Sequence, residues 1–333
     1  IVAAYQYWGS SCVQHLDGMF SFAIWDEKEK NLFAARDRFG EKPFFFFYDG
    51  VQFLFASEQK TLWNLGVQKV VNESMLYNFL SIGYTSNPGD PKETFFQELY
   101  KLPSASFLNY ALQKREMEIE RYWQLNLESI NISDKEAIDQ FRSLFESSVN
   151  KRMRSDVPFG TSLSGGLDSS SVVAYCENVS SIQNSHKCFT ATFPGSEINE
   201  LPFARKVVEK FGLHHYVIEI NDTDVVSLME KVMAHQEEPF GSSSVLAQYQ
   251  VFAEAKKQGV TVLLDGQGAD EVLAGYHHYY KWYWQELYRH KKLYTSKELN
   301  DARQLGIKEP FTLKNKLAAL IPDFAGSILQ TRK

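Results

Sequence analysis

The second part of the chain alternates short apolar runs with amphipathic stretches, and this alternation restricts the fold more than any other sequence feature. Strands that alternate with helices pair in parallel, because each helical crossover returns the chain to the same end of the sheet. We therefore predict a doubly wound α/β fold, with helices on both faces of a parallel sheet. The predicted strands are 187–193, 215–220 and 260–265, and the predicted helices are 137–152, 200–213, 224–235 and 244–258.

One turn in this region has an unusual composition. Residues 162–171 read SLSGGLDSSS and lead from a short apolar run into a helical stretch. Gly165 and Gly166 permit a bend in which successive N–H groups face one concavity, and the helix that follows adds its positive end. Ligands of open parallel sheets bind beyond the carboxyl ends of the strands, where this turn lies. Taken alone, the turn is more typical of an ordinary Gly-Ser loop with a serine helix cap.

Asp168 indicates which kind of anion the turn could hold. A carboxylate repels phosphate unless a cation lies between them, so its presence favours bound Mg²⁺. The hydroxyls of Ser164, Ser169 and Ser170 could supply further hydrogen-bond donors. The turn contains neither GxxxxGKS/T nor GxGxxG, so we expect neither a Walker-type loop nor a dinucleotide-binding loop.

The first part of the chain has a different pattern. Short segments rich in aromatic and β-branched residues, separated by charged or glycine turns, predict antiparallel strands within 19–26, 31–37, 43–49 and 51–57. The run of four phenylalanines at 44–47 indicates a strand buried on both faces, as in a layered sandwich. The stretch that follows is more irregular: residues 76–90 pass from a helical segment into a Pro/Gly loop. Composition and periodicity divide the chain near 124–137.

Composition excludes several classes of protein. The chain has 333 residues, of which 44% are hydrophobic and 23% charged, as in an ordinary globular protein of about two domains. The net charge of −6 gives no basic footprint for nucleic acid, and no apolar run approaches the ~20 residues that span a bilayer. Cys12, Cys176 and Cys188 lack metal-ligand spacing and no secretory signal is present, so we expect a cytoplasmic protein.

The motifs resemble those of a known family. SGGLDSS resembles the pyrophosphate-binding loop of the ATP pyrophosphatases, which adenylylate a substrate at the expense of ATP. The second part is similar to the synthetase domain of glutamine-dependent asparagine synthetases, and the first part to the later portion of their glutaminase domain. The motifs occur in the family's order: HLDGMFSFAIWD (15–26), LFAARDRFGEKPFFF (32–46), FASEQK (55–60), KLPSASFL (101–108), FTATFPGS (189–196), FARKVVEKFGLHHY (203–216), EEPFGSSS (237–244) and DGQGADEVLAGY (265–276).

The resemblance implies an α/β architecture in two parts. Residues 1–123 would form part of an Ntn-type glutaminase β-sandwich (glutamine amidotransferase type 2), followed by a linker at 124–136. Residues 137–333 would form the N-terminal part of a doubly wound ATP pyrophosphatase domain, of the adenine nucleotide α-hydrolase-like kind. We expect the chain to be an internal piece that lacks both ends of the family's sequence. Residue 1 is Ile, and Cys12 has no free amine beside its thiol, so we expect no glutamine hydrolysis by this chain.

The resemblance also implies site residues. Asp168 and Asp270 would hold Mg²⁺, Asp17 would recognise the α-amino group of glutamine, and Gln267 and Glu271 are the catalytic candidates. Gln267 stands where many members have glutamate, and an amide cannot take a proton at neutral pH. The residues that would contact ATP or pyrophosphate are Ser162, Ser164, Gly165, Gly166, Leu167, Asp168, Ser169, Ser170, Ala191, Asp265 and Gly266.

The reaction that the resemblance implies belongs to the intact protein. The β-carboxylate of aspartate would attack MgATP to give β-aspartyl-AMP and pyrophosphate, and ammonia from glutamine would displace AMP to give asparagine. ATP and Mg²⁺ are the implied cofactors, the partners are these small molecules rather than nucleic acid or membrane, and a homodimer is compatible with the family. Two alternatives stay open: another carboxylate-adenylylating ligase of the same branch, and a non-catalytic nucleotide-binding remnant.

Two aromatic segments bear on solubility. The phenylalanines at 44–47 and the helical stretch 274–290 carry more apolar surface than a solvent-facing element normally does. We expect both to lack covering layers in this chain, which would then bind hydrophobic dyes or aggregate.

Overall fold

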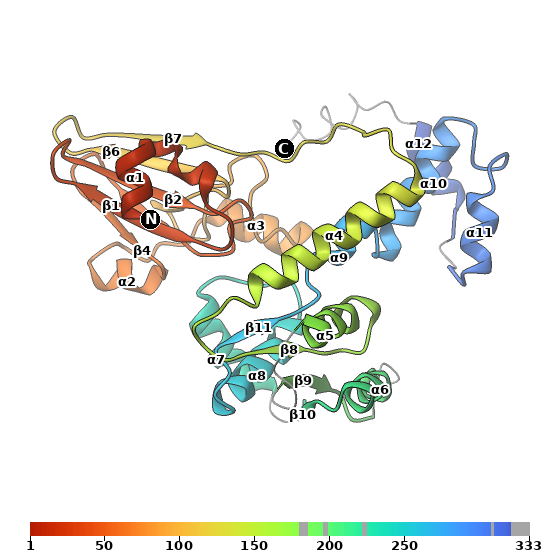
Figure 1. The fold of residues 1–333 in the computed structure, drawn as a ribbon. Coiled ribbons are helices and arrows are strands. Elements are labelled where there is room, and N and C mark those ends of the chain that lie inside the picture. Colours follow the sequence, from red (N-terminus) through yellow and green to blue (C-terminus); the bar gives the residue numbers. More distant parts are fainter. Residues whose placement is uncertain (180–185, 196–198, 222–224, 308–309, 321–333) are drawn as a thin grey trace. The chain divides into compact units, whose positions relative to one another are not determined.

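Figure 1 shows the computed structural model of the chain, which describes residues 1–179, 186–195, 199–221, 225–307 and 310–320. Packing divides the chain into two compact units. Unit 1 comprises Ile1–Ser143, Phe193–Gly195 and Glu219–Glu254. Unit 2 comprises Leu144–Thr192, Ser196–Ile218 and Ala255–Lys333.

Unit 1 contains two antiparallel sheets, with strand orders β1-β2-β6-β7 and β4-β3-β5. The predicted strands of the first part are all present as β1 to β4. The predicted helix and loop within 76–90 are also present, but β5, β6 and β7 lie in the later part of this stretch, where we expected irregular structure, and there the expectation is wrong. The strands are β1 (Ser21–Asp26), β2 (Asn31–Arg36), β3 (Phe45–Tyr48), β4 (Phe53–Ala56), β5 (Leu99–Lys101), β6 (Ser106–Ala111) and β7 (Glu116–Arg121).

The four consecutive phenylalanines lie at the centre of unit 1. Side chains alternate between the two faces of a strand. Phe44 and Phe46 therefore pack between the two sheets, and Phe45 and Phe47 pack on the opposite face against helical residues. Phe44 and Phe46 are only 4% and 1% exposed. The prediction of a strand buried on both faces is confirmed, and the expectation that this run lacks a covering layer is wrong.

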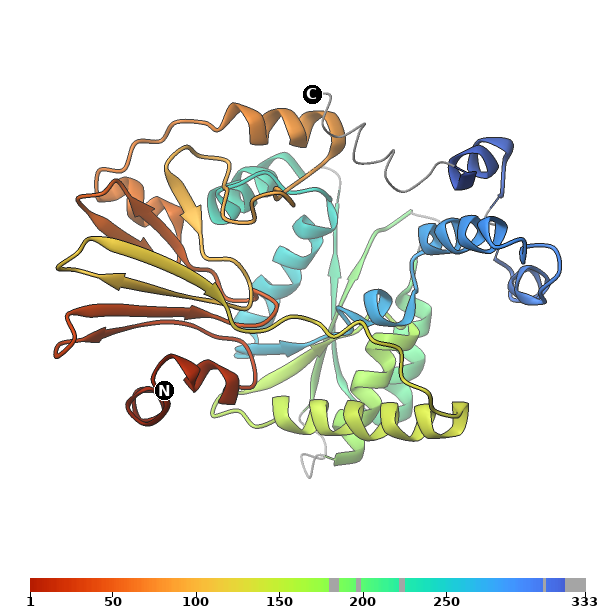
Figure 2. The ribbon, with the colours of Figure 1, turned by 90° about the horizontal axis from the view of Figure 1, so that it is seen from above.

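Helices cover the outer face of each sheet, so unit 1 has four layers in the order α-β-β-α. Cys12 and Val13 pack with Phe33 of β2 on one outer face, and Leu62 and Met75 fill the core beneath β3 and β4 on the other. Figure 2 shows the corresponding red and orange helices on opposite sides of the two sheets. These helices are α1 (Val2–Trp8), the 3₁₀ helix η1 (Gly9–His15), α2 (Gln59–Asn64) and α3 (Glu73–Ile82).

Unit 1 also contains most of two later helices, α7 (Val225–Gln236) and α8 (Ser244–Lys257). The connection between them carries two glutamates that bind backbone of the earlier part. Glu237 accepts hydrogen bonds from the N–H groups of Gln59 (2.6 Å) and Lys60 (3.1 Å) at the start of α2. Glu238 accepts one from the N–H of Phe95 (3.1 Å). The Glu237 side chain is 5% exposed, and the ammonium of Lys60 lies 3.5 Å from its carboxylate.

Unit 2 contains one sheet with the strand order β10-β9-β8-β11. β8 pairs in parallel with both β9 and β11, as the alternation of strands and helices predicts. The strands are β8 (Phe159–Ser162), β9 (Lys187–Thr192), β10 (His214–Glu219) and β11 (Val262–Leu264).

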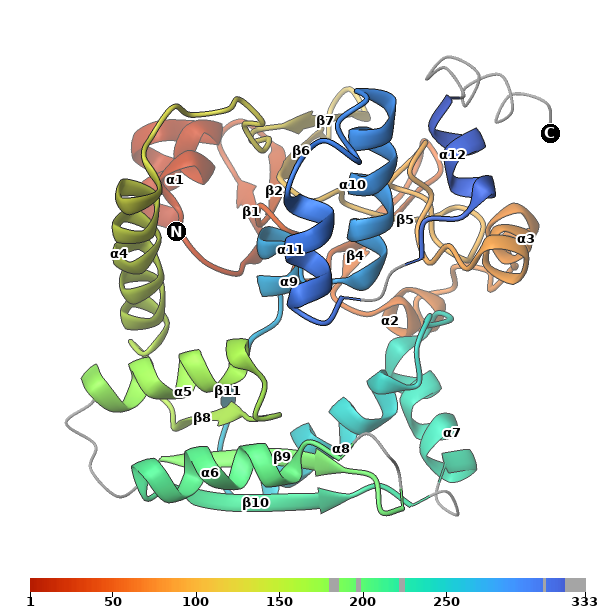
Figure 3. The same ribbon diagram turned by 90° about the vertical axis from the view of Figure 1, so that its right-hand side faces the viewer.

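Helices α4 (Asp134–Arg152), α5 (Leu167–Val179) and α6 (Leu201–Phe211) supply the cores beside this sheet. Figure 3 shows α5 and α6 beside the strands. Cys176 and Cys188 are buried members of these cores. Burial raises the pKa of each thiol to about 12, with the nearby Glu177 carboxylate adding to the shift.

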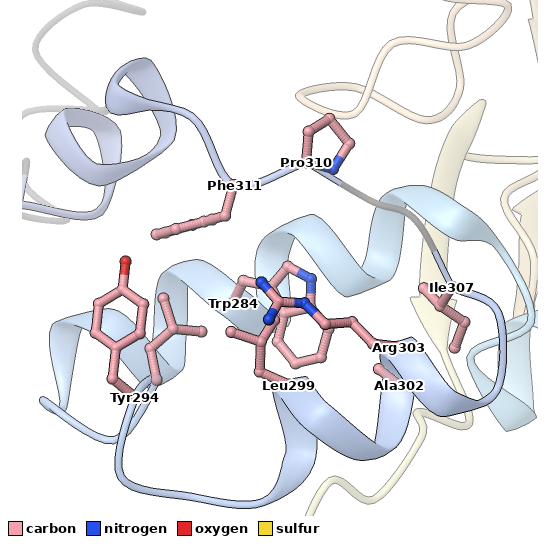
Figure 4. Close-up of a pocket in the computed structure, with 9 residues that line it drawn as sticks. Trp284, Tyr294, Leu299, Ala302, Arg303, Ile307, Pro310 and Phe311 are labelled. Carbon is pink, nitrogen blue, oxygen red and sulfur yellow. The ribbon is translucent and has the colours of Figure 1, made fainter.

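Helices α10 (His277–Arg289) and α11 (Glu298–Gln304), with the segments that follow them, form a separate core around Trp284, which is buried against Leu287, Leu293 and Ala302. The expectation that this helix lacks a covering layer is wrong for Trp284, which is 2% exposed, whereas Trp282 and Tyr283 on the same helix are exposed. A cavity of about 430 Å³ lies between Trp284 and residues of the two following segments (Figure 4). The described helices after β11 are α9 (Ala269–Leu273), α10 (His277–Arg289), α11 (Glu298–Gln304) and α12 (Leu313–Leu320).

Within the described ranges, no helix combines the length and the apolar character that crossing a membrane requires.

Candidate nucleotide site

Predicted site residues from three adjacent strands meet at one edge of the unit 2 sheet. The parallel register places Thr161 of β8 beside Cys188 of β9 and beside Leu264 of β11. Ser162, Ala191 and Asp265 follow these positions along the three strands. They therefore lie toward the carboxyl ends of the strands, which is the edge where open α/β sheets bind ligands.

The turn between β8 and α5 is tight and closely packed. Gly165 has a φ of +88°, and a Cβ at this position would overlap the backbone of Phe203 and Ala204 at the start of α6. Glycine is required here both for the backbone conformation and for the close approach of the helix. The turn leads directly into α5, a helix of 13 residues whose first N–H groups point back toward the turn. Such a helix start attracts anions.

The serines of the turn have different hydrogen-bond partners. The hydroxyls of Ser164 and Ser169 lie 3.0 Å apart, and the Ser164 N–H donates to the Ser169 hydroxyl at 3.3 Å. The Ser171 hydroxyl donates to the Leu167 carbonyl within its own helix. The Ser170 hydroxyl is buried and has no hydrogen-bond partner within the described ranges. The structure thus brings Ser164 and Ser169 together in the turn, whereas the Ser171 hydroxyl is hydrogen-bonded within the helix.

The segment after β11 packs against the first turn of α5. A Cβ at Gly266 would lie 2.9 Å from the Cβ of Asp168 and 2.9 Å from the backbone nitrogen of Ser169. Only glycine allows this approach, which brings two predicted nucleotide-binding segments into contact. Asp265 accepts a hydrogen bond from the N–H of Gln267 at 3.1 Å, so it stabilises the turn that follows the strand.

The two acids of α9 have partners of their own. The Asp270 carboxylate lies against the backbone of Gly275, and Glu271 accepts a hydrogen bond from the Tyr276 hydroxyl at 2.9 Å. This hydrogen bond raises the pKa of Tyr276 above its usual value, because the carboxylate stabilises the protonated phenol. The described residues contain no group of three or more His, Cys, Asp or Glu side chains around a common metal position.

The residue predicted to bind glutamine belongs to unit 1. Asp17 is exposed in the loop between η1 and β1, and it is followed by Gly18, whose φ is +119°. Cys12 is fully buried, and burial raises the pKa of its thiol. A buried, protonated thiol is a poor nucleophile, which agrees with our expectation that Cys12 is not a catalytic nucleophile.

Two histidine–threonine contacts in this sheet were missed by the sequence patterns. Thr190 donates a hydrogen bond to the Leu163 carbonyl (2.6 Å) and lies 2.8 Å from Nε2 of His215. Thr161 lies 3.1 Å from Nε2 of His186, whose other ring nitrogen contacts Glu177. The sequence did contain a signal for these contacts, because a threonine in the middle of an apolar strand needs a buried hydrogen-bond partner. Sequence alone does not show which partner it has.

Two family models match consecutive parts of the chain. Residues 1–123 match the family described as glutamine amidotransferase domain, and residues 140–321 match the family described as asparagine synthase. The second match extends over more than half of the chain. The chain belongs to the asparagine synthase family.

Two of the curated proteins similar to this chain carry the name asparagine synthetase (glutamine-hydrolyzing). A provisionally named asparagine synthetase (glutamine-hydrolyzing) 2 of Methanocaldococcus jannaschii is 33% identical over 328 residues, which cover 94% of this chain and 62% of the relative. The asparagine synthetase (glutamine-hydrolyzing) 3 of Bacillus subtilis is 32% identical over 289 residues, or 83% of this chain and 46% of the relative. A Gibberella zeae protein named amidase chry2 is 27% identical over 292 residues, or 83% and 42%. The chain spans about half the length of these relatives.

Proposed function

We propose that unit 2 binds MgATP and that the intact protein uses it to convert aspartate to asparagine with ammonia from glutamine. The observation that carries the proposal is the turn at 163–166, which combines a tight glycine bend, two adjacent serine hydroxyls and the start of α5. Because the chain belongs to the asparagine synthase family, we propose that this turn binds the pyrophosphate portion of ATP.

The turn would act mainly by positioning and by offsetting negative charge. The N–H groups at the start of α5 and the hydroxyls of Ser164 and Ser169 would hold the pyrophosphate group as it leaves. Ser162, Ala191 and Asp265, at the strand ends, would contact the rest of the nucleotide. Holding the reactants in line is worth several kcal/mol of the activation barrier in reactions of this type.

Carboxylate oxygens are the ligands that Mg²⁺ prefers, and Asp168 and Asp270 fit that requirement. Mg²⁺ bound to ATP usually keeps several waters and needs only one or two protein carboxylates. When bound, the cation would neutralise phosphate charge. Asp168 lies on the first turn of α5, and its Cβ packs against Gly266 of the proposed nucleotide segment.

The proposed chemistry has two displacements. An aspartate β-carboxylate oxygen attacks the α-phosphorus and the bond to the bridging oxygen breaks, which releases pyrophosphate. Ammonia then attacks the acyl carbon, and AMP leaves with the bonding electrons. Gln267 can orient these groups by hydrogen bonds but cannot accept a proton at neutral pH. Glu271, which receives the Tyr276 hydrogen bond, is the candidate proton acceptor.

We also propose that unit 1 is the Ntn-type glutaminase fold, with Asp17 binding the α-amino group of glutamine. The four layers in the order α-β-β-α, with the two antiparallel sheets packed through Phe44 and Phe46, support this assignment. The family range 1–123 is consistent with a glutaminase region that ends before a linker at 124–136.

Calorimetric titration with Mg²⁺ and pyrophosphate tests the proposal for unit 2. Asp168→Ala removes the carboxylate that links the cation to the turn, and we expect about 10- to 100-fold weaker binding, the range for a lost charge-assisted contact. Ser171→Ala is the matched control, because its hydroxyl is bound within α5. Equal affinity for the wild type and Asp168→Ala would refute the assignment. Absence of binding to the wild type would also refute it.

A second candidate is a ligase that activates a different carboxylate. The similarity to a protein named as an amidase, and the amide at Gln267, favour keeping this alternative. Release of pyrophosphate from ATP by the full-length protein, measured with aspartate and with a panel of other carboxylates, distinguishes the two.

A further inference from the structure

A chain of hydrogen bonds crosses the unit 2 sheet from His215 on β10 to the peptide that begins the turn. The Thr190 hydroxyl on β9 donates its single hydrogen to the Leu163 carbonyl at 2.6 Å. Nε2 of His215 lies 2.8 Å from the same hydroxyl oxygen. Because the hydroxyl hydrogen is already used, His215 must be the donor, so its Nε2 carries a proton. We call these two contacts the His215–Thr190 relay.

The peptide that receives the relay is held on its other side as well. The carbonyl of Leu163 and the N–H of Ser164 belong to one planar peptide unit, so the direction of one fixes that of the other. The Ser164 N–H donates to the Ser169 hydroxyl at 3.3 Å, and that hydroxyl also lies 3.0 Å from the Ser164 hydroxyl. Rotation of this peptide would therefore break contacts with Thr190 and Ser169 together.

Burial increases the importance of these contacts. Thr190 and Leu163 are each 1% exposed, and Ser169 is also buried. Hydrogen bonds are stronger in such surroundings, and an unpaired buried carbonyl or hydroxyl is costly. The opposite end of Leu163 is fixed too, since its N–H donates to the Phe189 carbonyl at 2.9 Å. Hydrogen bonds to β9 therefore fix the orientation of Leu163 at both its N–H and its carbonyl.

We infer that His215 and Thr190 are positioning residues of the pyrophosphate site, which orient the Leu163–Ser164 peptide and through it the Ser169 hydroxyl. Neither residue touches the anion. His215 lies on the edge strand of the sheet and donates a hydrogen bond to the Thr190 hydroxyl. That hydroxyl in turn orients the Leu163 carbonyl. This inference rests on the proposed function of the turn.

Thr190→Val tests the relay because valine keeps the shape of threonine and removes only the hydroxyl. We expect Mg²⁺-pyrophosphate to bind about fivefold more weakly, the factor that corresponds to one hydrogen bond. Thr190→Ser keeps the hydroxyl and should bind like the wild type. The matched control is Thr192→Val: Thr192 lies on the same face of β9, but its hydroxyl donates to Asn199 instead of the turn.

Hydrogen exchange of the ligand-free protein separates this inference from the proposed function. In Thr190→Val, amides of 163–170 should exchange about fivefold faster while those of α6 keep the wild-type rate. A merely structural loss would speed exchange in both segments and would overturn the inference, as would wild-type exchange in 163–170. Should Thr190→Val not fold, His215→Phe, which removes the first donor, supports the same comparison. If the wild type binds no pyrophosphate, the proposed function fails and the exchange result still decides on the relay.

Discussion

At the scale of single residues, His215 is set in surroundings that disfavour its charged form. Burial, followed by the positive charge of Arg205 on α6, lowers the pKa of His215 from 6.5. Its contact on β9 is the neutral hydroxyl of Thr190. The ring therefore donates its Nε2 hydrogen while it is uncharged, and protonation adds a second positive charge near Arg205.

This shift predicts a pH dependence of stability. In the unfolded chain the histidine pKa is near 6.5. Below that pH the unfolded state binds more protons than the folded state, so the free energy of unfolding falls as the pH falls from about 6.5 to the folded pKa. His215→Gln should flatten this part of the profile. Urea denaturation at a series of pH values measures it, with the exposed His290→Gln as control. An unchanged slope in His215→Gln would contradict the prediction.

The residues of the site differ in how far sequence can predict them. Gly165 was predictable from the need for a bend, but its contact with Ala204 was not, because α6 comes much later in the chain. The same holds for Gly266 against Asp168. Thr190 and His215 were missed because a hydrogen bond between neighbouring strands depends on strand order, which the local pattern does not contain. Local chemistry thus predicted the turn, and tertiary contacts supplied its supports.

At the scale of elements, the start of α2 depends on an acid from a distant segment. Glu237 occupies the position of a capping side chain for two N–H groups of α2, and it adopts a φ of +63°, which is unusual for a residue with a side chain. A short helix has little stability of its own, so the cap and the packing beneath it decide whether it forms. The carboxylate also brings a negative charge to the positive end of the helix.

Glu237→Gln should destabilise unit 1. The amide retains the shape of the side chain but loses the negative charge. In Glu237 that charge strengthens the hydrogen bonds from both N–H groups and pairs with the ammonium of Lys60. Hydrogen bonds to a buried charged group are worth about 1.5–3 kcal/mol, and we expect a loss of that size in the free energy of unfolding. Glu230→Gln, on the exposed face of α7, is the control for the change in net charge. Denaturation curves that coincide for the two variants would rule out the capping role.

Strand prediction succeeded where one physical pattern dominated. β1 to β4 were found from aromatic runs between turns. β6 was missed because it lies between β2 and β7, with Phe107 and Leu108 buried on opposite faces, so its sequence does not alternate. β7 does alternate, with Met117 and Ile119 facing the core. Its many glutamates obscured a signal that was present.

At the scale of the whole molecule, the clusters of buried residues belong to one unit or the other. The cores around Phe46, Leu62 and Phe33 lie in unit 1, and those around Cys188 and Trp284 lie in unit 2. The proposed pyrophosphate residues also lie within unit 2. A ligand that binds one cooperative unit stabilises that unit by mass action.

Calorimetry of the chain should therefore resolve two unfolding transitions. Saturating Mg²⁺ and pyrophosphate should raise the temperature of one of them, with a stabilisation of about 2.7 kcal/mol at a ligand concentration 100 times the Kd. The transition that Glu237→Gln lowers should stay unchanged. Asp168→Ala serves as the control: because its binding is expected to be 10- to 100-fold weaker, the stabilisation should fall to about 0.4–1.4 kcal/mol at the same ligand concentration. One transition that moves as a whole would mean that the two units unfold together.

The glutamates between α7 and α8 have a consequence for synthesis on the ribosome. Glu238 follows its partner Phe95 by 143 residues. At a translation rate of 5–20 residues per second, the N–H groups of Phe95, Gln59 and Lys60 emerge about 7–36 s before their carboxylates. The nascent first unit must wait through that interval with α2 uncapped. Slow codons between these segments would prolong the time during which chaperones can bind it.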